Sequence, residues 1–166
     1  LYADASGEGG FAAWTVCGCE VVAVGGLWSA AERAMHISEL ELLASTFGSV
    51  ALAPWLPCDV YSYTDNTVAQ AAMRRLTARS EATQAVIARR SRWLRRQERL
   101  EAPRRITSAA NVWADVGSRP ERGGMLELER LAVAAGYGFR RVSVPADWRD
   151  TAGLRLPSPV WGGVLG

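Results

Sequence analysis

The chain has 166 residues, 49% of them hydrophobic and 22% charged, which is typical of one folded domain with a buried core and excludes a disordered segment. No run of about 20 apolar residues is present and the first residues do not resemble a signal peptide, so we expect no membrane association and no secretion. Three cysteines and one histidine argue against a disulfide framework or a zinc site, which favours an intracellular location, the cytoplasm or nucleus.

The net charge of +2 conceals an uneven distribution, because all 19 basic residues are arginines and eleven of them lie between residues 74 and 105. Only three glutamates share that segment, so it carries a charge of +8 and the rest of the chain −6. One basic element beside an acidic remainder is typical of a protein that holds a polyanion in one place and metal ions in another. A solvated helix face, with arginine stems lying over apolar surface, is the alternative interpretation.

The first part of the chain predicts strands followed by a helix. Residues 1–6, 11–17 and 20–27 have strand character, with a glycine turn between the first two, and suggest an antiparallel meander. Apolar residues then recur at a helical period from residue 37 to residue 47, which indicates a helix buried on one face.

The second part alternates strands and helices. We expect a strand over residues 60–64, a short strand over 105–107, a possible added strand over 139–144, and helices over 66–76, 80–100, 110–117 and 125–135. Pro103 is expected to end the long arginine-rich helix. This order predicts an α/β domain with a core over residues 1–123. Residues 124–166 add a helix, the possible strand and an irregular tail that packs on the core or on a neighbouring domain.

Four acidic residues occupy positions that need a physical reason. Asp4 lies within the first predicted strand, Asp65 at the end of the fourth, Glu41 in the half-buried helix and Asp115 near the start of a later helix. Acidic residues are depleted in strands and costly to bury, and a divalent cation offsets the repulsion between clustered carboxylates. Each also has a local explanation, as a turn residue, a helix cap, a capping-box partner or a first-turn acid.

Four segments carry a resemblance to a known family. In chain order they are residues 2–6 (YADAS), 36–44 (HISELELLA), 63–67 (YTDNT) and 111–119 (NVWADVGSR). Together they resemble the ribonuclease H domain of retroelement reverse transcriptases, in particular of retrotransposons that carry a tyrosine recombinase. The resemblance covers about residues 1–119. It implies a ribonuclease H-like fold, with a central mixed five-stranded sheet, antiparallel in its first three strands, flanked by helices.

The resemblance also implies an activity. It predicts a two-metal-ion endonuclease that hydrolyses the RNA strand of RNA–DNA hybrids, covalently linked to a reverse transcriptase domain; the missing initiator methionine likewise suggests a piece of a longer polypeptide. Two Mg²⁺ ions, for which Mn²⁺ can substitute, would be held by Asp4, Glu41, Asp65 and Asp115. Asp4 would bridge the ions, and Asp115 would help hold the one that activates water. The helix phase leaves Glu41 and Glu39 open, and the resemblance selects Glu41.

Nucleic-acid contacts are expected from three polar residues and from the basic helix. Main-chain groups near Ser6, in residues 5–7, and the side chains of Ser38 and Asn66 are placed to contact the 2′-hydroxyls of the hybrid. The remaining candidates grip the phosphates of the DNA strand or lie along a sugar or base: Arg89, Arg90, Arg92, Arg95, Arg96 and Trp93. Trp93 has a core position as its alternative.

Two other functions remain open. The first is a catalytically silent domain of the same fold that serves as a scaffold or binding module. The second is a related metal nuclease, although Ser6 stands where exonucleases of that type carry a second acid, and a junction resolvase needs a different substrate. Residues 106–110 lack the loop histidine of many cellular members of the resembling family, which implies slower turnover, and His36 is expected to cap or pack near the first helix.

Overall fold

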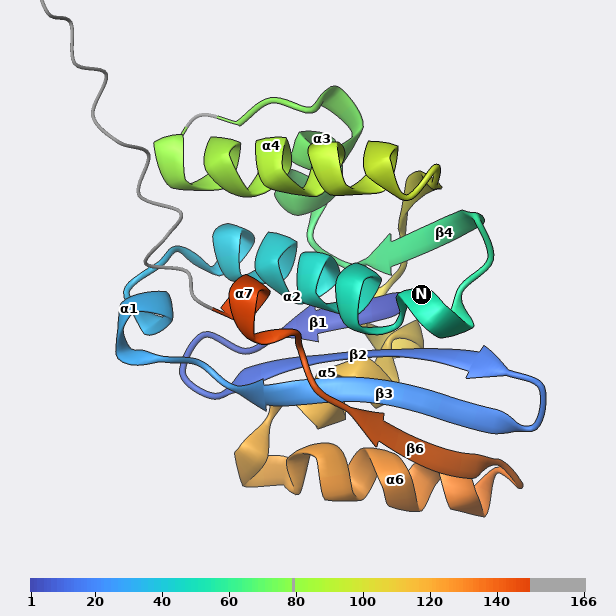
Figure 1. Cartoon of the computed structure of the whole chain (residues 1–166). Helices are drawn as coiled ribbons and strands as arrows, with labels where there is room; N and C mark the ends of the chain where they lie inside the picture. Colours follow the sequence, from blue (N-terminus) through green and yellow to red (C-terminus); the bar gives the residue numbers. More distant parts are fainter. Residues whose placement is uncertain (79, 150–166) are drawn as a thin grey trace, which may run out of the picture.

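A mixed six-stranded sheet forms the centre of this α/β fold (Figure 1). The structure is a computed structural model and describes residues 1–78 and 80–149, so the predicted irregular tail beyond residue 149 lies outside the described residues. The strands are β1 (Tyr2–Ala5), β2 (Gly10–Cys17), β3 (Glu20–Leu27), β4 (Asp59–Thr64), β5 (Leu100–Arg105) and β6 (Gly138–Val142).

The strand order is β5-β4-β1-β2-β3-β6. β1, β2 and β3 form the predicted antiparallel meander, whereas β4 pairs parallel to β1 and β5 parallel to β4. The prediction of a five-stranded sheet is wrong by one strand, because β6 pairs parallel to β3 and covers what would otherwise be an open edge. The C-terminal part that is described therefore packs on the core.

The position of the fifth strand also differs from the prediction. We expected a short strand over residues 105–107, but β5 spans Leu100–Arg105 and includes Pro103. A proline cannot donate to a strand ladder, so it is tolerated here because β5 lies at the edge of the sheet. The preceding helix therefore ends earlier than predicted, at Arg96, and Glu98 turns the chain with a φ of 51°.

Helices cover both faces of the sheet (Figure 1). α2 (Ile37–Ala51), α3 (Thr67–Arg75) and α4 (Glu81–Arg96) lie on one face, and α5 (Val112–Ser118) and α6 (Gly124–Ala134) on the other. Shorter elements complete the chain: α1 (Ala30–Arg33), α7 (Ala146–Arg149), and the 3₁₀ turns η1 (Ala53–Trp55), η2 (Ser108–Ala110) and η3 (Pro120–Arg122). Within residues 1–78 and 80–149, no helix combines the length and the apolar character needed to cross a membrane.

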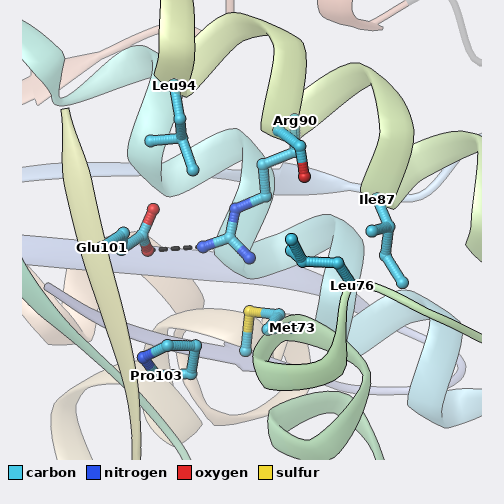
Figure 2. Close-up of a pocket in the computed structure, with 8 residues that line it drawn as sticks. Met73, Leu76, Ile87, Arg90, Leu94, Glu101 and Pro103 are labelled. Atoms are coloured by element: carbon cyan, nitrogen blue, oxygen red, sulfur yellow. Dashed lines mark hydrogen bonds and ion pairs between the residues drawn. The ribbon is translucent and has the colours of Figure 1, made fainter. Parts of the chain in front are cut away.

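The inner face of α4 carries a charged residue into the interior (Figure 2). The Arg90 guanidinium lies 2.5 Å from Glu101 of β5, and the two side chains are only 6% and 1% exposed. The same guanidinium also donates to the hydroxyls of Ser45 and Ser49 on α2. The predicted contact between Arg90 and nucleic acid is therefore wrong, because this side chain is buried in an ion pair between α4 and β5.

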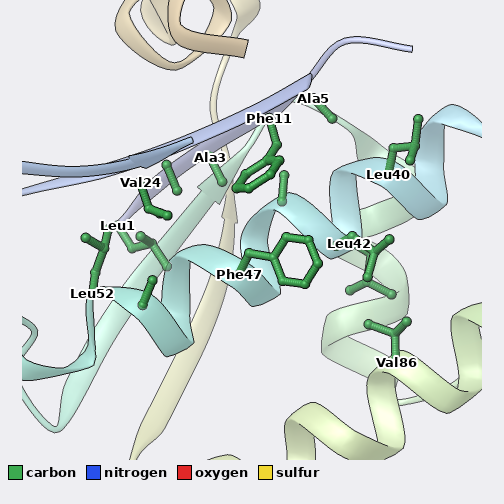
Figure 3. Close-up of a cluster of buried hydrophobic side chains, with 14 of the residues drawn as sticks. Leu1, Ala3, Ala5, Phe11, Val24, Leu40, Leu42, Phe47, Leu52 and Val86 are labelled. Carbon is green, nitrogen blue, oxygen red and sulfur yellow. The ribbon is translucent and has the colours of Figure 1, made fainter. Parts of the chain in front are cut away.

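Two apolar clusters hold the helices to the sheet. The larger cluster lies between the sheet and α2, where Phe11 and Phe47 meet edge to face with ring centres 5.2 Å apart (Figure 3). The smaller cluster joins Ala12, Val21 and Ala23 of the opposite face to Leu128 of α6. Because β2 alternates between the clusters, each of its successive side chains serves a different face. The meander is thereby held rigidly from both sides, and β1 lies at its inner edge.

Candidate metal centre

Three carboxylates from separate elements meet at one end of β1 and β4. Asp4 lies on β1, Glu41 on α2, and Asp65 directly after β4, and one oxygen from each lies within 4.8 Å of the others. The pairing of the parallel strands explains part of this arrangement. Tyr2 is opposite Tyr63, so two residues further along each strand Asp4 and Asp65 come side by side on the same face.

The start of α2 decides between the two candidate glutamates. Glu39 completes a capping box with His36, the predicted cap, and also accepts hydrogen bonds from Ser80 and Thr83 at the start of α4. Residues two apart on a helix point about 200° from each other. Glu41 is accordingly turned inward, is 4% exposed and accepts the Ala5 amide at 3.3 Å. The structure therefore selects Glu41, and the predicted capping-box alternative for this residue is wrong.

The centre places two buried carboxylates, Asp4 and Glu41, beside the partly exposed Asp65. Burial raises the pKa of Asp4 to about 7, and repulsion from Asp65 and Asp115 adds to the shift against a hydrogen bond from Ser118. Burial, with repulsion from Asp4 and Asp65, raises the pKa of Glu41 to about 9. Both carboxylates are thus held in a site that disfavours their charged forms. An oxygen-only ligand set of this kind fits a hard divalent cation such as Mg²⁺.

Each of the three carboxylates accepts a hydrogen bond from a different hydroxyl group. Ser118 donates to Asp4 over 2.7 Å and Ser108 to Asp65 over 2.6 Å. Thr64 contributes a longer contact to Glu41 at 3.4 Å. Such outer partners fix the orientation of metal ligands. None of the three was a predicted site residue, although Ser118 lies within the motif that contains Asp115.

Asp115 does not join the three other acids. Its two oxygens are held by Arg119 at 2.7 Å and by Arg122 at 3.1 Å. Asp115 is still near enough to raise the pKa of Asp4 by repulsion. The prediction that four acids converge therefore agrees with the structure for Asp4, Glu41 and Asp65. For Asp115 it needs correction, because ion pairs hold that side chain apart.

The three predicted polar contacts differ in their surroundings. Ser6 is buried, its hydroxyl donates to the Ser118 carbonyl, and its main-chain N–H and C=O bind Gly10 and Trp28. Direct contact of Ser6 with a substrate is therefore a wrong prediction, since its polar groups are used inside the protein. Asn66 caps α3 through its side-chain oxygen, and Ser38 lies half-buried in the first turn of α2.

The predicted basic surface on α4 is smaller than expected. Arg92, Arg95 and Arg96 are exposed. Arg89 instead lies over the ring of Trp148, 4.1 Å from its centre, and donates to the Asp147 carbonyl, so it fastens α7. Trp93 packs edge-on against Trp148 with ring centres 6.2 Å apart, which favours its alternative role in an internal contact.

Comparisons of the chain with models of protein families, with curated proteins and with solved structures found no match.

Proposed function

We propose that this chain is a ribonuclease H-like domain that hydrolyses the RNA strand of RNA–DNA hybrids with the help of two divalent cations. The observation that carries the proposal is the meeting of Asp4, Glu41 and Asp65, which three distant segments bring within 4.8 Å of one another. A buried cluster of carboxylates without a paired cation is costly, and a metal-dependent reaction is the function that best accounts for it.

The arrangement of elements gives further support. The resembling family has its first aspartate on the first strand, its glutamate on the first long helix and its second aspartate after the fourth strand, and Asp4, Glu41 and Asp65 occupy such positions. The antiparallel order of β1, β2 and β3, with β4 parallel to β1, also agrees with the expected sheet. The proposal includes a covalently linked reverse transcriptase domain as the neighbour.

In this proposal each residue has a role that follows from its position. Asp4, Glu41 and Asp65 would hold one cation, and Asp4 with Asp115 would hold the other. Bound divalent ions supply the positive charge that stabilises the attacking and leaving oxygens of the phosphodiester. Ser118 and Ser108 keep Asp4 and Asp65 oriented. The exposed arginines of α4 would bind backbone phosphates, which makes affinity dependent on salt.

A cleavage assay on the purified chain tests the proposal. A hybrid with end-labelled RNA, incubated with Mg²⁺, should give RNA fragments that end in a 5′-phosphate and a 3′-hydroxyl, while duplex DNA stays intact. Asp65→Asn should reduce the rate by more than the roughly 10- to 100-fold that loss of an outer partner of a metal ligand costs. Asp59→Asn, an exposed change at the far end of β4, is the matched control. Equal rates in the wild type and Asp65→Asn would overturn the assignment.

A catalytically silent scaffold of the same fold is the second candidate. The observation that favours it is the pairing of Asp115 with Arg119 and Arg122, which leaves the acid outside the cluster. In that case the chain would bind nucleic acid or a protein partner but would not cleave the hybrid at any concentration of Mg²⁺ or Mn²⁺. The same assay, run beside a binding measurement on the intact hybrid, separates the two functions.

A further inference from the structure

The ion pairs of Asp115 occupy both oxygens of its carboxylate. Arg119 Nε binds Oδ1 and Arg122 Nη1 binds Oδ2. The first arginine is four residues further along the chain, at the end of α5, and the second belongs to η3. In this conformation the carboxylate has its strongest available partners on both sides. A cation bound to Asp115 in this conformation would lie beside two positively charged guanidiniums, whose repulsion opposes its binding.

The three clustered acids and Asp115 therefore differ in their readiness to bind a cation. Asp4, Glu41 and Asp65 already lie within the distance that a single ion needs. The main chain of Asp115 is fixed close by, because the Ser118 hydroxyl that binds Asp4 also lies 2.9 Å from the Asp115 carbonyl. Only the Asp115 side chain would have to move to bring a fourth carboxylate to the cluster. The structure is thus prepared for one cation and incomplete for a second.

The two arginines are also suited to a different ligand. Their side chains are 34% and 58% exposed, so an incoming group can reach both guanidiniums. Arg119 is close enough to the centre to lower the pKa of Asp4. A guanidinium binds phosphate with the same forked geometry that it uses for a carboxylate. A phosphodiester at the centre would therefore compete with Asp115 for these arginines.

We infer that Arg119 and Arg122 are positioning residues that hold Asp115 away from the centre until a nucleic-acid phosphate takes its place. Phosphate binding then releases the carboxylate, so that the second cation site is weak in the free chain and becomes complete when substrate is present. The inference rests on the proposed function and adds to it the order of events, with the first cation binding before substrate and the second with it. No covalent bond changes in this exchange of ion-pair partners.

Calorimetric titration of the chain with Mn²⁺, in the absence of nucleic acid, tests the inference. The wild type should bind one ion tightly and a second weakly. In Arg119→Gln/Arg122→Gln the second dissociation constant should fall by about tenfold, a change that loss of two partly exposed ion pairs can supply. Arg130→Gln, which removes an exposed arginine paired with Glu127 on α6, should leave both constants unchanged.

A third variant separates release of the carboxylate from simple loss of positive charge. Adding Asp115→Asn to the double variant should abolish the tenfold gain, because the gain requires the freed carboxylate. If the gain persists in the triple variant, or if the double variant binds no more tightly than the wild type, the inference is overturned. Should the double variant fail to fold, Arg122→Gln alone, at the more exposed position, gives the same test with a smaller gain.

A second readout addresses the phosphate. The double variant should bind an RNA–DNA hybrid more weakly than the wild type in the absence of divalent ions, with a smaller dependence on salt. Equal affinity and equal salt dependence would contradict the predicted role of the arginines. Failure of the wild type to bind Mn²⁺ at all would instead refute the proposed function, so the two failures are distinguishable.

Discussion

Two regions of the molecule bury carboxylates, and they differ in whether a positively charged side chain is paired with them. Under α4, Glu101 is paired with the Arg90 guanidinium at 2.5 Å and accepts hydrogen bonds from Ser49. At the end of β1, Asp4 and Glu41 lie beside Asp65, and within residues 1–78 and 80–149 no arginine forms an ion pair with any of the three. Arg119, which is paired with Asp115, acts on the cluster only through its charge, which lowers the pKa of Asp4.

The difference separates a carboxylate whose charge has a structural partner from carboxylates that are candidates for binding a cation. A buried ion pair satisfies its own charges and requires no ligand, although it contributes little net stability over an apolar contact. A buried acid without a partner destabilises the protein until a proton or a cation arrives. Burial alone would therefore place both regions among candidate sites. The balance of charge around each carboxylate is what makes only one of them a candidate cation centre.

The largest expected effect on stability comes from removing the buried ion pair between Arg90 and Glu101. Arg90→Met leaves Glu101 buried without a partner and should lower the free energy of unfolding by about 3–5 kcal/mol, measured by urea denaturation. Arg92→Met, an exposed change on the same helix, should cost less than about 0.5 kcal/mol. The double change Arg90→Met/Glu101→Leu should recover most of the loss. An Arg90→Met variant as stable as the wild type would show that Arg90 does not stabilise the buried charge of Glu101.

The cluster of Asp4, Glu41 and Asp65 should instead make the stability of the protein depend on pH. The folded-state pKa values of Asp4 and Glu41 lie above their ordinary values, at about 7 and about 9, because burial disfavours their charged forms. The folded state therefore binds more protons than the unfolded state between about pH 4 and pH 9, and stability falls as pH rises through that window. The metal-free chain should become progressively less stable across it, measured by urea denaturation at a series of pH values.

Two controls assign this loss to the acidic cluster. Mg²⁺ should reduce the fall, because a bound cation stabilises the charged forms of Asp4 and Glu41 in the folded state. Glu41→Gln removes one of the titrating groups and should flatten the profile without Mg²⁺. A profile that is equally steep in the wild type and in Glu41→Gln would contradict the origin assigned to it.

The smallest effect compares one buried hydroxyl from each region. Ser118→Ala and Ser49→Ala each remove a hydrogen bond to a buried carboxylate and should each cost about 1 kcal/mol of stability. Only Ser118→Ala should also weaken Mn²⁺ binding, by about tenfold or more, because it frees Asp4 to reorient. The measurement is a Mn²⁺ titration of both variants. Equal Mn²⁺ affinity in the two variants would mean that Ser118 serves packing alone.

Much of the fold could be predicted because it depends on local patterns. Runs of strand-forming residues predicted β1, β2, β3 and β4, and the 3.6-residue period predicted α2. The errors fell where tertiary context overrides a local rule. Pro103 stops a helix in isolation but is accepted in an edge strand, and β6 became part of the sheet because β3 had a free edge.

In the basic segment, tertiary contacts likewise decided which arginines are available to bind nucleic acid. Its charge was evident from the sequence, yet Arg89, Arg90 and Arg99 bind groups of the protein itself, namely the Asp147 carbonyl, Glu101 and the carbonyls of residues 53, 56 and 57. Whether an arginine faces solvent or a buried acceptor depends on the packing of α4 against α2 and β5. Residue counts carry no information about that packing.

The sequence by itself identified the candidate cation ligands, with Glu39 and Glu41 left open, because acids within strands and a half-buried helix violate the usual preferences of those elements. The tertiary structure alone decided which acids meet, that Glu41 turns inward while Glu39 caps its helix, and that Asp115 is held by two arginines. The physical reason is that electrostatic balance depends on distance in space. The chain brings together groups more than 100 residues apart, such as Asp4 and Ser118.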